Sequence, residues 1–403
     1  MLTTLLYRSH ISDDVTLKTL ENMVNKASER NALYDVTGIL LFNGTHFFQL
    51  LEGPEDGVNA VYNRICADAK HHNVVELMRD HAPARRFGNA GMELFDLRAH
   101  EEFSVLQSVL DRGTSRYQLT YDDRALQFLR TFVEATEKKN YFEVLPADHW
   151  VFLPDEQSAP QPVSALPHAD EYGFAFQPIV DPMAREVVSV EAKMRGPNGS
   201  SLKDYFATLT PQAMYETDLS AKALALAQAS SLGIDGLTLS INLLPMSLIE
   251  VPDAINFLLS AIETNGLVPQ QVVVEVMESD VVSRGDDFEQ AVRQLKAAGI
   301  GLAIDNFGAG SAGLLMLTRV QPDRIKIDRN IIRDVHKSGP KQAIVLAIIK
   351  CCTALEIAVT AEGVEHPEEW MWLEVAGISS FQGALFAAPA PGALPLVAWP
   401  ELR

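Results

Sequence analysis

Polar residues stand at the ends of successive apolar runs in the carboxy-terminal part of the chain. They are Glu191, Asn242, Glu275, Asp305, Lys326 and Glu362. In a β/α barrel the chemistry lies where strands end and loops begin, so such residues would converge on one face. Converging carboxylates need a cation, and oxygen ligands favour Mg²⁺ or Mn²⁺. The pattern predicts metal-assisted attack on a phosphodiester, although any one acid alone reads more simply as a solvated loop residue.

A glycine-rich run offers a different chemistry. The sequence GAGSAG at residues 308–313 follows an expected strand, and Asp328 lies twenty residues beyond its start, which is formally a dinucleotide-binding fingerprint. The strand before it ends in Asp305 and Asn306, whose side chains would crowd a pyrophosphate. The run also lies in the middle of a β/α alternation instead of opening a domain. We therefore reject this interpretation.

The elements that would position these residues alternate between strand and helix over residues 170–400. Helical patterns cover residues 218–232, 253–265, 286–298 and 341–355. Strands are expected to begin near Phe174, Val187, Thr238, Val272, Leu302, Arg324, Ala358 and Ser380. Eightfold alternation over this length predicts an α/β fold, a (β/α)₈-type barrel.

The amino-terminal residues 1–97 carry a different pattern. Strands are expected at 2–9, 36–43, 46–51, 74–79 and 92–97, and helices at 13–31 and 55–70. The order βαββαββ predicts an α+β, ferredoxin-like sandwich. Residues 98–169 form the connector: a helix at 122–138, which would serve as a relay or a homodimer contact, and a proline-rich linker at 157–167.

Charge and composition exclude several functions. The chain has 403 residues, of which 47% are hydrophobic, and its 53 acidic against 33 basic residues give a net charge of −20. A field of that sign opposes binding to nucleic acids and anionic membranes. No apolar run approaches the ~20 residues of a membrane span, and no export signal opens the sequence. Three cysteines make neither a disulfide framework nor a zinc site, so we expect a reduced, cytoplasmic protein.

Residues 170–400 resemble the EAL family of cyclic di-GMP phosphodiesterases, which are β/α barrels. The matching segments are EAKMR at 191–195, INL at 241–243, EVME at 275–278, DNFG at 305–308, KID at 326–328, AEGVE at 361–365 and QG at 382–383. The resemblance implies a first metal on Glu191, Asn242, Glu275 and Asp305. It implies a second metal on Asp305, Asn306 and Glu362. In an active enzyme, Lys326 and Glu362 would be catalytic, and the substrate would contact Gln177, Arg195 and Gln382.

The sequence departs from the EAL pattern at several of these positions. Lys193 stands where leucine is usual, Met277 where threonine is expected, and Asn306 replaces the second acid of a tandem aspartate pair. The asparagine removes a negative charge from the second-metal site, and two close cations repel strongly without such charge. The second metal should therefore bind weakly, which leaves catalysis by the barrel open.

In the first hundred residues the notable polar residue is Gln49, which lies among aromatic and apolar neighbours. An unsatisfied buried amide costs about 1–3 kcal/mol, so a buried Gln49 would need a partner. A solvent-facing position on an edge strand is the alternative. Tyr7 on the first strand and Asn31 at the end of the first helix are the other candidates.

Residues 1–97 resemble the BLUF family of blue-light sensors, which use FAD. The resemblance rests on Tyr7, Asn31, VTGIL at 36–40 and FFQLLEG at 47–53. It implies a flavin between the two helices, with Asn31 at its carbonyl edge and Gln49 bonded to flavin and Tyr7. Light would drive electron and proton transfer from Tyr7, after which the Gln49 amide returns rearranged.

The resemblance reaches further positions near the expected cofactor. Asp68, Lys70 and His71 match polar positions near the ribityl and phosphate end, and Met92 matches a methionine linked to the switch. Ala90 stands where many members carry a tryptophan, so we do not expect a signal carried by that ring.

As a whole, the chain resembles enterobacterial proteins that join a BLUF domain to a degenerate EAL domain. Their resemblance implies a light-dependent antirepressor that binds a MerR-type repressor, and an acidic surface suits competition with DNA for a basic protein. Because Glu362 is retained, a blue-light-activated cyclic di-GMP phosphodiesterase remains the alternative. A barrel that binds the dinucleotide without hydrolysing it is the third interpretation.

Overall fold

The computed structural model describes residues 2–11, 17–82, 85–87, 91–98, 102–111, 124–134, 144, 146–154, 172–197, 200–234, 236–283, 285–310 and 313–403. The chain forms two units, Met1–Val144 with Asp334–Ile344, and Leu145–Arg333 with Val345–Arg403. Ala90 and the linker expected at 157–167 lie outside the described residues. In the described parts of the chain, no helix has the length and apolar character needed to cross a membrane.

The first unit is built on a five-stranded sheet in the order β4-β1-β3-β2-β5. Its strands are β1 (Leu2–Ile11), β2 (Thr37–Phe42), β3 (His46–Pro54), β4 (His71–Ala82) and β5 (Glu93–Asp96). β1 pairs antiparallel with β3 and β4, β2 pairs antiparallel with β3, and β5 runs parallel to β2. The first four strands with two helices have the ferredoxin-like order, so the predicted α+β sandwich is confirmed, and β5 extends it.

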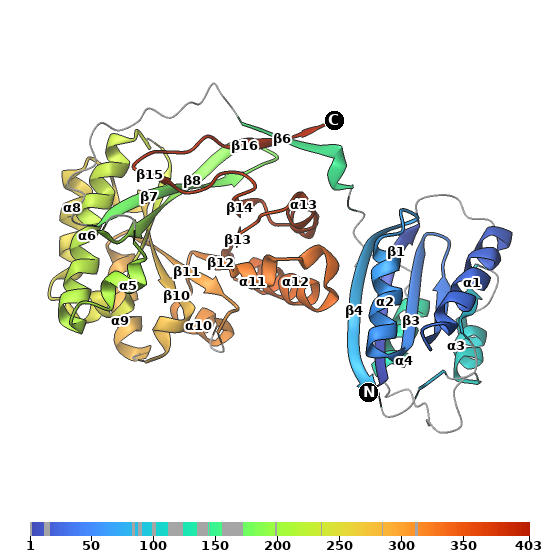
Figure 1. Ribbon diagram of the computed structural model, residues 1–403. Coiled ribbons are helices and arrows are strands. Elements are labelled where there is room, and N and C mark those ends of the chain that lie inside the picture. The colour runs from blue at the N-terminus through green and yellow to red at the C-terminus, as the bar shows by residue number, and fades with distance from the viewer. Residues whose placement is uncertain are drawn as a thin grey trace. The chain divides into compact units, whose positions relative to one another are not determined.

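Helices cover both faces of this sheet (Figure 1). α1 (Leu17–Ala32) and α2 (Glu55–Cys66) pack on one face, and α3 (Glu102–Asp111) and α4 (Arg124–Glu134) pack on the other. Because side chains alternate along a strand, β3 directs Phe47 and Leu51 to the α1–α2 side and Phe48 and Leu50 to the α3–α4 side. Gln49 therefore points toward α1 and α2.

The second unit contains an eight-stranded closed barrel, which confirms the predicted fold. Its strands are β7 (Gly173–Asp181), β8 (Glu186–Arg195), β9 (Thr238–Asn242), β10 (Val272–Met277), β11 (Gly301–Phe307), β12 (Arg324–Ile327), β13 (Ala358–Glu362) and β14 (Ser380–Gln382). Pairing of β14 with β7, where Phe381 meets Val180, closes the barrel. The departure from regular β/α alternation is β7, which forms a hairpin with β8 and runs antiparallel to both neighbours because no helix separates it from β8.

Helices surround the barrel strands (Figure 1). The α-helices are α5 (Leu202–Phe206), α6 (Pro211–Ser231), α7 (Pro245–Glu250), α8 (Ala254–Thr264), α9 (Gly285–Ala297), α10 (Gly313–Val320), α11 (Arg329–Ile332), α12 (Gly339–Ala354) and α13 (Pro367–Ala376). α6 begins earlier than predicted, because Thr210 caps it by accepting a hydrogen bond from the Ala213 amide at 3.3 Å. Proline at the first helical position fits that start.

Short elements complete the second unit. β6 (Trp150–Pro154) pairs with β16 (Ala398–Leu402), and β15 (Ala390–Pro391) pairs with β7. The 3-10 helices are η1 (Ala147–His149), η4 (Pro269–Gln271), η5 (Glu278–Ser283) and, in the segment assigned to the first unit, η6 (Val335–Lys337).

The register of the parallel strands brings polar residues to one level of the barrel. Asn242 on β9 lies opposite Glu275 on β10, and Glu362 on β13 lies opposite Gln382 on β14. Since the carboxyl ends of parallel strands share one end of a barrel, these side chains meet there.

Candidate functional site

A pocket in the first unit lies between α1, α2 and the first face of the sheet; we call it the sensor pocket. All seven residues that the sequence assigned to the flavin line it: Tyr7, Asn31, Gln49, Asp68, Lys70, His71 and Met92. Apolar side chains such as Leu20, Val24 and Val61 complete its walls. The pocket is thus an apolar slot with a few polar groups, the usual make-up of a cofactor site.

Tyr7, Gln49 and Met92 form a continuous hydrogen-bond chain inside the sensor pocket. The Tyr7 hydroxyl donates to Gln49 Oε1, and Gln49 Nε2 donates to Met92 Sδ at 3.1 Å. The strand register sets this contact, because Tyr7 on β1 lies directly opposite Gln49 on β3. Burial, with Tyr62 and Cys66 adding to it, holds the pKa of Tyr7 well above its usual value, so the phenol is a donor. β3 is a central strand, so the edge-strand interpretation of Gln49 is wrong.

Asn31, at the end of α1, provides the test of whether the sensor pocket fits a flavin. Its side chain is buried, and Nδ2 has no hydrogen-bond partner among the described residues. A buried amide donor without a partner costs about 1–3 kcal/mol, which an acceptor on a bound group would offset. The donor, the apolar walls and the nearby cations fit a flavin with its phosphates.

The sequence did not single out three further cations of the sensor pocket. Lys26 and Arg30 from α1 and Arg64 from α2 also line it. They are exposed helix residues, and nothing in their spacing separated them from an ordinary solvated helix face.

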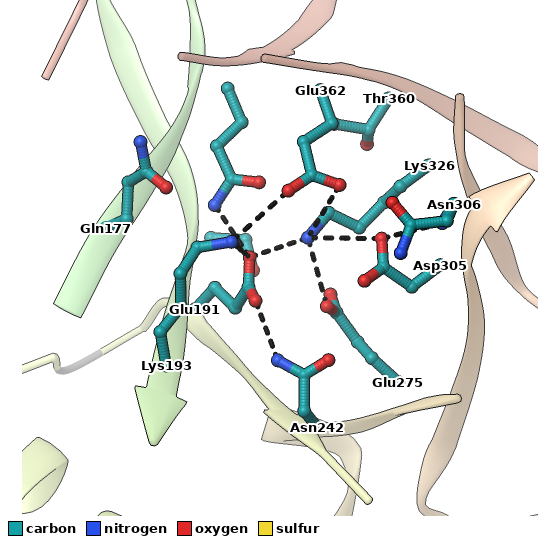
Figure 2. A network of polar contacts seen from close by, with 12 residues as sticks. Gln177, Glu191, Lys193, Asn242, Glu275, Asp305, Asn306, Lys326, Thr360 and Glu362 are labelled. Atoms are coloured by element: carbon teal, nitrogen blue, oxygen red, sulfur yellow. Dashed lines mark hydrogen bonds and ion pairs between the residues drawn. The ribbon is translucent and has the colours of Figure 1, made fainter. Parts of the chain in front are cut away.

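In the barrel, four carboxylates surround the ammonium group of Lys326, which is fully buried. We call these four residues the carboxylate cluster: Glu191, Glu275, Asp305 and Glu362 (Figure 2). The distances from Lys326 Nζ are 2.6 Å to Glu191 Oε2, 3.0 Å to Glu275 Oε2, 3.9 Å to Asp305 Oδ1 and 3.9 Å to Glu362 Oε2. Each acid comes from a different strand, and Lys326 from β12 stands between them.

A second ammonium, that of Lys193, also enters the carboxylate cluster. Lys193 Nζ lies 2.9 Å from Glu191 Oε2 and 3.2 Å from Glu362 Oε1 (Figure 2). Lys193 follows Glu191 by two residues on β8, so both side chains project from the same face of the strand. The sequence flagged Lys193 only as a departure, and the structure brings it among the predicted metal ligands.

The pKa values of the four carboxylates are shifted in different directions. Burial alone would raise the pKa of Glu191, but the ammonium groups of Lys326 and Lys193 outweigh it and hold that pKa well below its usual range. The pKa of Glu362 is lowered in the same way. Burial raises the pKa of Asp305 well above its usual value and also raises that of Glu275. The two acids whose pKa is lowered are therefore the two that Lys193 contacts.

The donor set of the carboxylate cluster does not fit a bound Mg²⁺ or Mn²⁺. Across the described residues, no group of three or more His, Cys, Asp or Glu side chains is arranged so that it could hold a metal ion. Glu275 Oε1 and Glu362 Oε2 accept no hydrogen bond within the described chain, yet both carboxylates lie beside Lys326. Asn306 has a left-handed backbone, with φ of 53°, and its backbone N–H donates to Asp305 Oδ1 at 2.9 Å.

The three predicted substrate residues are dispersed. Arg195 lines a pocket beside the cluster, and its Nη1 donates to the Met194 carbonyl at 3.1 Å. Gln177 is buried and donates to the Ala387 carbonyl at 2.9 Å. Gln382 donates to Glu191 Oε2 at 2.8 Å, so it belongs to the cluster.

Sequence reasoning missed two buried residues that shape the pocket beside the cluster. Asp218 accepts hydrogen bonds from the Leu244 amide and the Ser247 hydroxyl, both at 2.8 Å, and from Lys222 Nζ at 2.7 Å. Asp218 and Lys222 line that pocket. Their i,i+4 spacing was a usable signal, but it is also typical of an exposed helix pair.

Comparison with known proteins identifies both units. The EAL domain model matches residues 162–389, and the BLUF model, described as sensors of blue light using FAD, matches residues 2–93. The chain is 56% identical, over the full length of both proteins, to the blue light- and temperature-regulated antirepressor BluF of Escherichia coli K12.

Solved structures agree with this assignment. The fold matches Klebsiella pneumoniae BlrP1, in a complex with manganese and cyclic di-GMP, with a TM-score of 0.92 and 42% identity over all of both chains. A standalone EAL protein from Vibrio cholerae, bound to cyclic di-GMP, is 32% identical over 58% of this chain and 97% of its own, with a TM-score of 0.54. The chain therefore belongs to the family of proteins that join a BLUF domain to an EAL domain.

Proposed function

We propose that this protein is a blue-light receptor whose barrel acts as a light-dependent antirepressor, binding a MerR-type repressor instead of hydrolysing cyclic di-GMP. The observation that carries the sensor half is the buried Tyr7–Gln49–Met92 chain in a pocket where the Asn31 donor has no partner among the described residues. The output half is supported by 56% identity to a protein named as an antirepressor. It is also supported by a carboxylate cluster whose partners are lysines.

The chain's own residues would hold FAD and move the proton. Asn31 would donate to the ring, and Asp68, Lys70 and His71 would lie near the ribityl and phosphate end. When bound, the flavin absorbs blue light and accepts an electron and a proton. Tyr7 is the donor, because its buried phenol keeps its proton and already contacts Gln49.

Loss of the Tyr7 donor would free the Gln49 amide to turn. Turning exchanges a donor for an acceptor and withdraws Nε2 from Met92 Sδ, its present partner. Met92 directly precedes β5 (Glu93–Asp96), so a change in one side-chain amide can bias the edge of the sheet. This gives a local switch with a neighbouring strand as its readout.

Charge supports a protein partner that otherwise binds DNA. The net charge of −20 would attract a basic repressor surface and compete with the phosphate backbone for it. In this proposal the barrel supplies a binding surface, and cyclic di-GMP turnover is not the output.

The proposal is tested with a MerR-type repressor bound to its fluorescently labelled operator. Adding the full-length, flavin-loaded protein under blue light should release the operator, which lowers its fluorescence polarisation, while the dark protein should not. Gln49→Leu should release no more in light than in darkness. Gln107→Leu, at an exposed position on α3, is the matched control and should behave as the unmodified protein.

The same samples also show which results would contradict the proposal. Operator release that is independent of light, or unaffected by Gln49→Leu, would contradict the switch. Rapid, light-dependent formation of linear dinucleotide from cyclic di-GMP without operator release would replace the antirepressor with a phosphodiesterase.

A further inference from the structure

Lys193 lines the solvent-accessible pocket of the barrel together with three acids of the carboxylate cluster, Glu191, Glu275 and Asp305. Its side chain is 20% exposed and lines that pocket, whereas Lys326 is fully buried behind the acids. Its Nζ reaches two carboxylates from different strands, Glu191 on β8 and Glu362 on β13. A lysine in this place holds one oxygen of each of two predicted metal ligands.

The Oε2 atom of Glu191 has no remaining capacity for a further cation. An ionised carboxylate offers about four lone-pair sites. Glu191 Oε1 accepts from Asn242 Nδ2 at 2.7 Å, and Oε2 is contacted by Lys326 Nζ at 2.6 Å, Gln382 Nε2 at 2.8 Å and Lys193 Nζ at 2.9 Å. Because each oxygen carries about two of these sites, a metal could bind Oε2 only by displacing one of the three groups that contact it.

The spacing of the acids also corresponds to an ammonium. Lys193 meets its two carboxylates at nitrogen–oxygen distances of 2.9 and 3.2 Å. Mg²⁺ would require about 2.0–2.1 Å to each oxygen, in a near-octahedral shell. The oxygens around Lys193 are therefore placed for a hydrogen-bonding ammonium, a compact point charge with three donors.

We propose that the Lys193 ammonium is a built-in counter-ion that occupies the position of a divalent cation and excludes one from the barrel. Because it is attached to the chain, it is present at every ion concentration in solution. The carboxylate cluster then stays assembled without metal. The inference goes beyond the proposed function, since it concerns the ion site of the barrel whatever protein the barrel binds.

The experiment is a titration of the full-length, flavin-loaded protein with Mn²⁺ in metal-free buffer. Unbound Mn²⁺ is followed by its electron paramagnetic resonance signal. Lys193→Leu removes the charge and should create a site that binds Mn²⁺ about tenfold or more tightly than the unmodified protein, which corresponds to about 1.4 kcal/mol. Lys193→Arg keeps the charge and should bind as weakly as the unmodified protein. Lys203→Leu, at an exposed lysine on α5, is the matched control and should change nothing.

A second measurement guards against a folding defect. Removing Lys193 leaves Glu191 and Glu362 with one ammonium instead of two, so Lys193→Leu should unfold at lower temperature in chelator and regain stability with Mn²⁺. The unmodified protein should show no shift. If Lys193→Leu does not fold, Lys193→Gln, which keeps a donor without the charge, is titrated in the same way.

Two results would overturn the inference. One is Mn²⁺ binding by the unmodified protein as tight as that of the folded neutral variant. The other is a folded neutral variant that gains neither Mn²⁺ affinity nor stability from Mn²⁺.

Discussion

The sensor pocket and the carboxylate cluster are both lined by buried polar side chains, but they differ in how those side chains are partnered. In the sensor pocket, Asn31 Nδ2 has no partner within the described chain. In the carboxylate cluster, every acid lies within 3.9 Å of a lysine nitrogen. Glu275 Oε1 and Glu362 Oε2 also accept no hydrogen bond among the described residues, but the charge of each carboxylate is matched by a lysine of the chain. The difference is therefore between a neutral donor that a bound ligand can satisfy and charges that the chain already balances.

We expect the largest effect from a substitution of Tyr7 in the sensor pocket. Tyr7→Phe removes the hydroxyl that donates to Gln49 but leaves the ring, so the flavin should still bind. The shift of the flavin absorption spectrum that we expect blue light to cause should be lost completely. The measurement is a light-minus-dark absorption spectrum. Tyr62→Phe, whose ring centroid lies 5.6 Å from that of Tyr7, should retain the shift. A normal shift in Tyr7→Phe would remove the hydroxyl from the mechanism.

The unpartnered amide gives the next largest effect. Asn31→Ala should weaken FAD binding about 10- to 100-fold, because the site loses a buried hydrogen bond worth about 1–3 kcal/mol. Titration calorimetry of FAD into the apoprotein measures this. Asn25→Ala, an exposed position on the same helix, should bind FAD normally. Equal affinity in the two variants would mean that the Asn31 donor is not aimed at the cofactor.

Glu374, on α13, is a half-buried acid with no ion pair among the described residues, in contrast to the acids of the carboxylate cluster, which lie beside lysines. Burial, with Asp181 adding to it, raises its pKa to about 7. The folded state therefore holds its proton more tightly than the unfolded state, so this contribution to stability is present below about pH 4.5 and is lost as the pH rises through 7.

Glu374→Gln should remove that loss. At pH 8 the variant should be more stable than the unmodified protein by about 1 kcal/mol, discounted for partial exposure, or about 2–4 °C in Tm. Thermal melts at pH 5 and pH 8 measure the difference, which should vanish at the lower pH. A constant difference between the two pH values would contradict the raised pKa.

The smallest expected effect is at Asn306. Asn306→Asp restores a carboxylate but leaves Lys193 beside Glu191 and Glu362, so hydrolysis of cyclic di-GMP should stay at background. Chromatography of the nucleotide products, with Mg²⁺ or Mn²⁺ present, measures this in light and darkness. A rise of orders of magnitude would show that the missing charge at Asn306, and not the lysine, limits the barrel.

The sequence predicted the elements well because their patterns are local. The Asn43-Gly44 turn joins β2 to β3 and defines the register of that hairpin, in which Leu40 lies opposite Gln49. The pairing of β1 with β3, which places Tyr7 opposite Gln49, is long-range in sequence and is set by the fold. The eight barrel strands were likewise visible as apolar runs. The β7–β8 hairpin was not, because strand direction depends on the closure of the barrel and not on local pattern.

The partners within each site were harder to predict. In the sequence, Lys193 is recognisable only as a departure from the EAL pattern. The fold shows that its ammonium reaches Glu362, a residue on a strand five positions later in the barrel. The contact of Glu278 was also not predictable from the sequence: its carboxylate accepts a hydrogen bond from the Gly308 amide at 2.7 Å and fixes the loop after β11. Contacts of this kind join residues far apart in the chain, so spacing carries no signal for them.

The contrast between the two sites is tested most directly by measuring flavin and manganese in one preparation. The full-length protein is equilibrated with excess FAD and Mn²⁺, passed through a desalting column, and analysed by flavin absorbance and elemental analysis. We predict one flavin per chain and manganese far below one per chain. Stoichiometric manganese, or a chain that retains no flavin, would contradict the account.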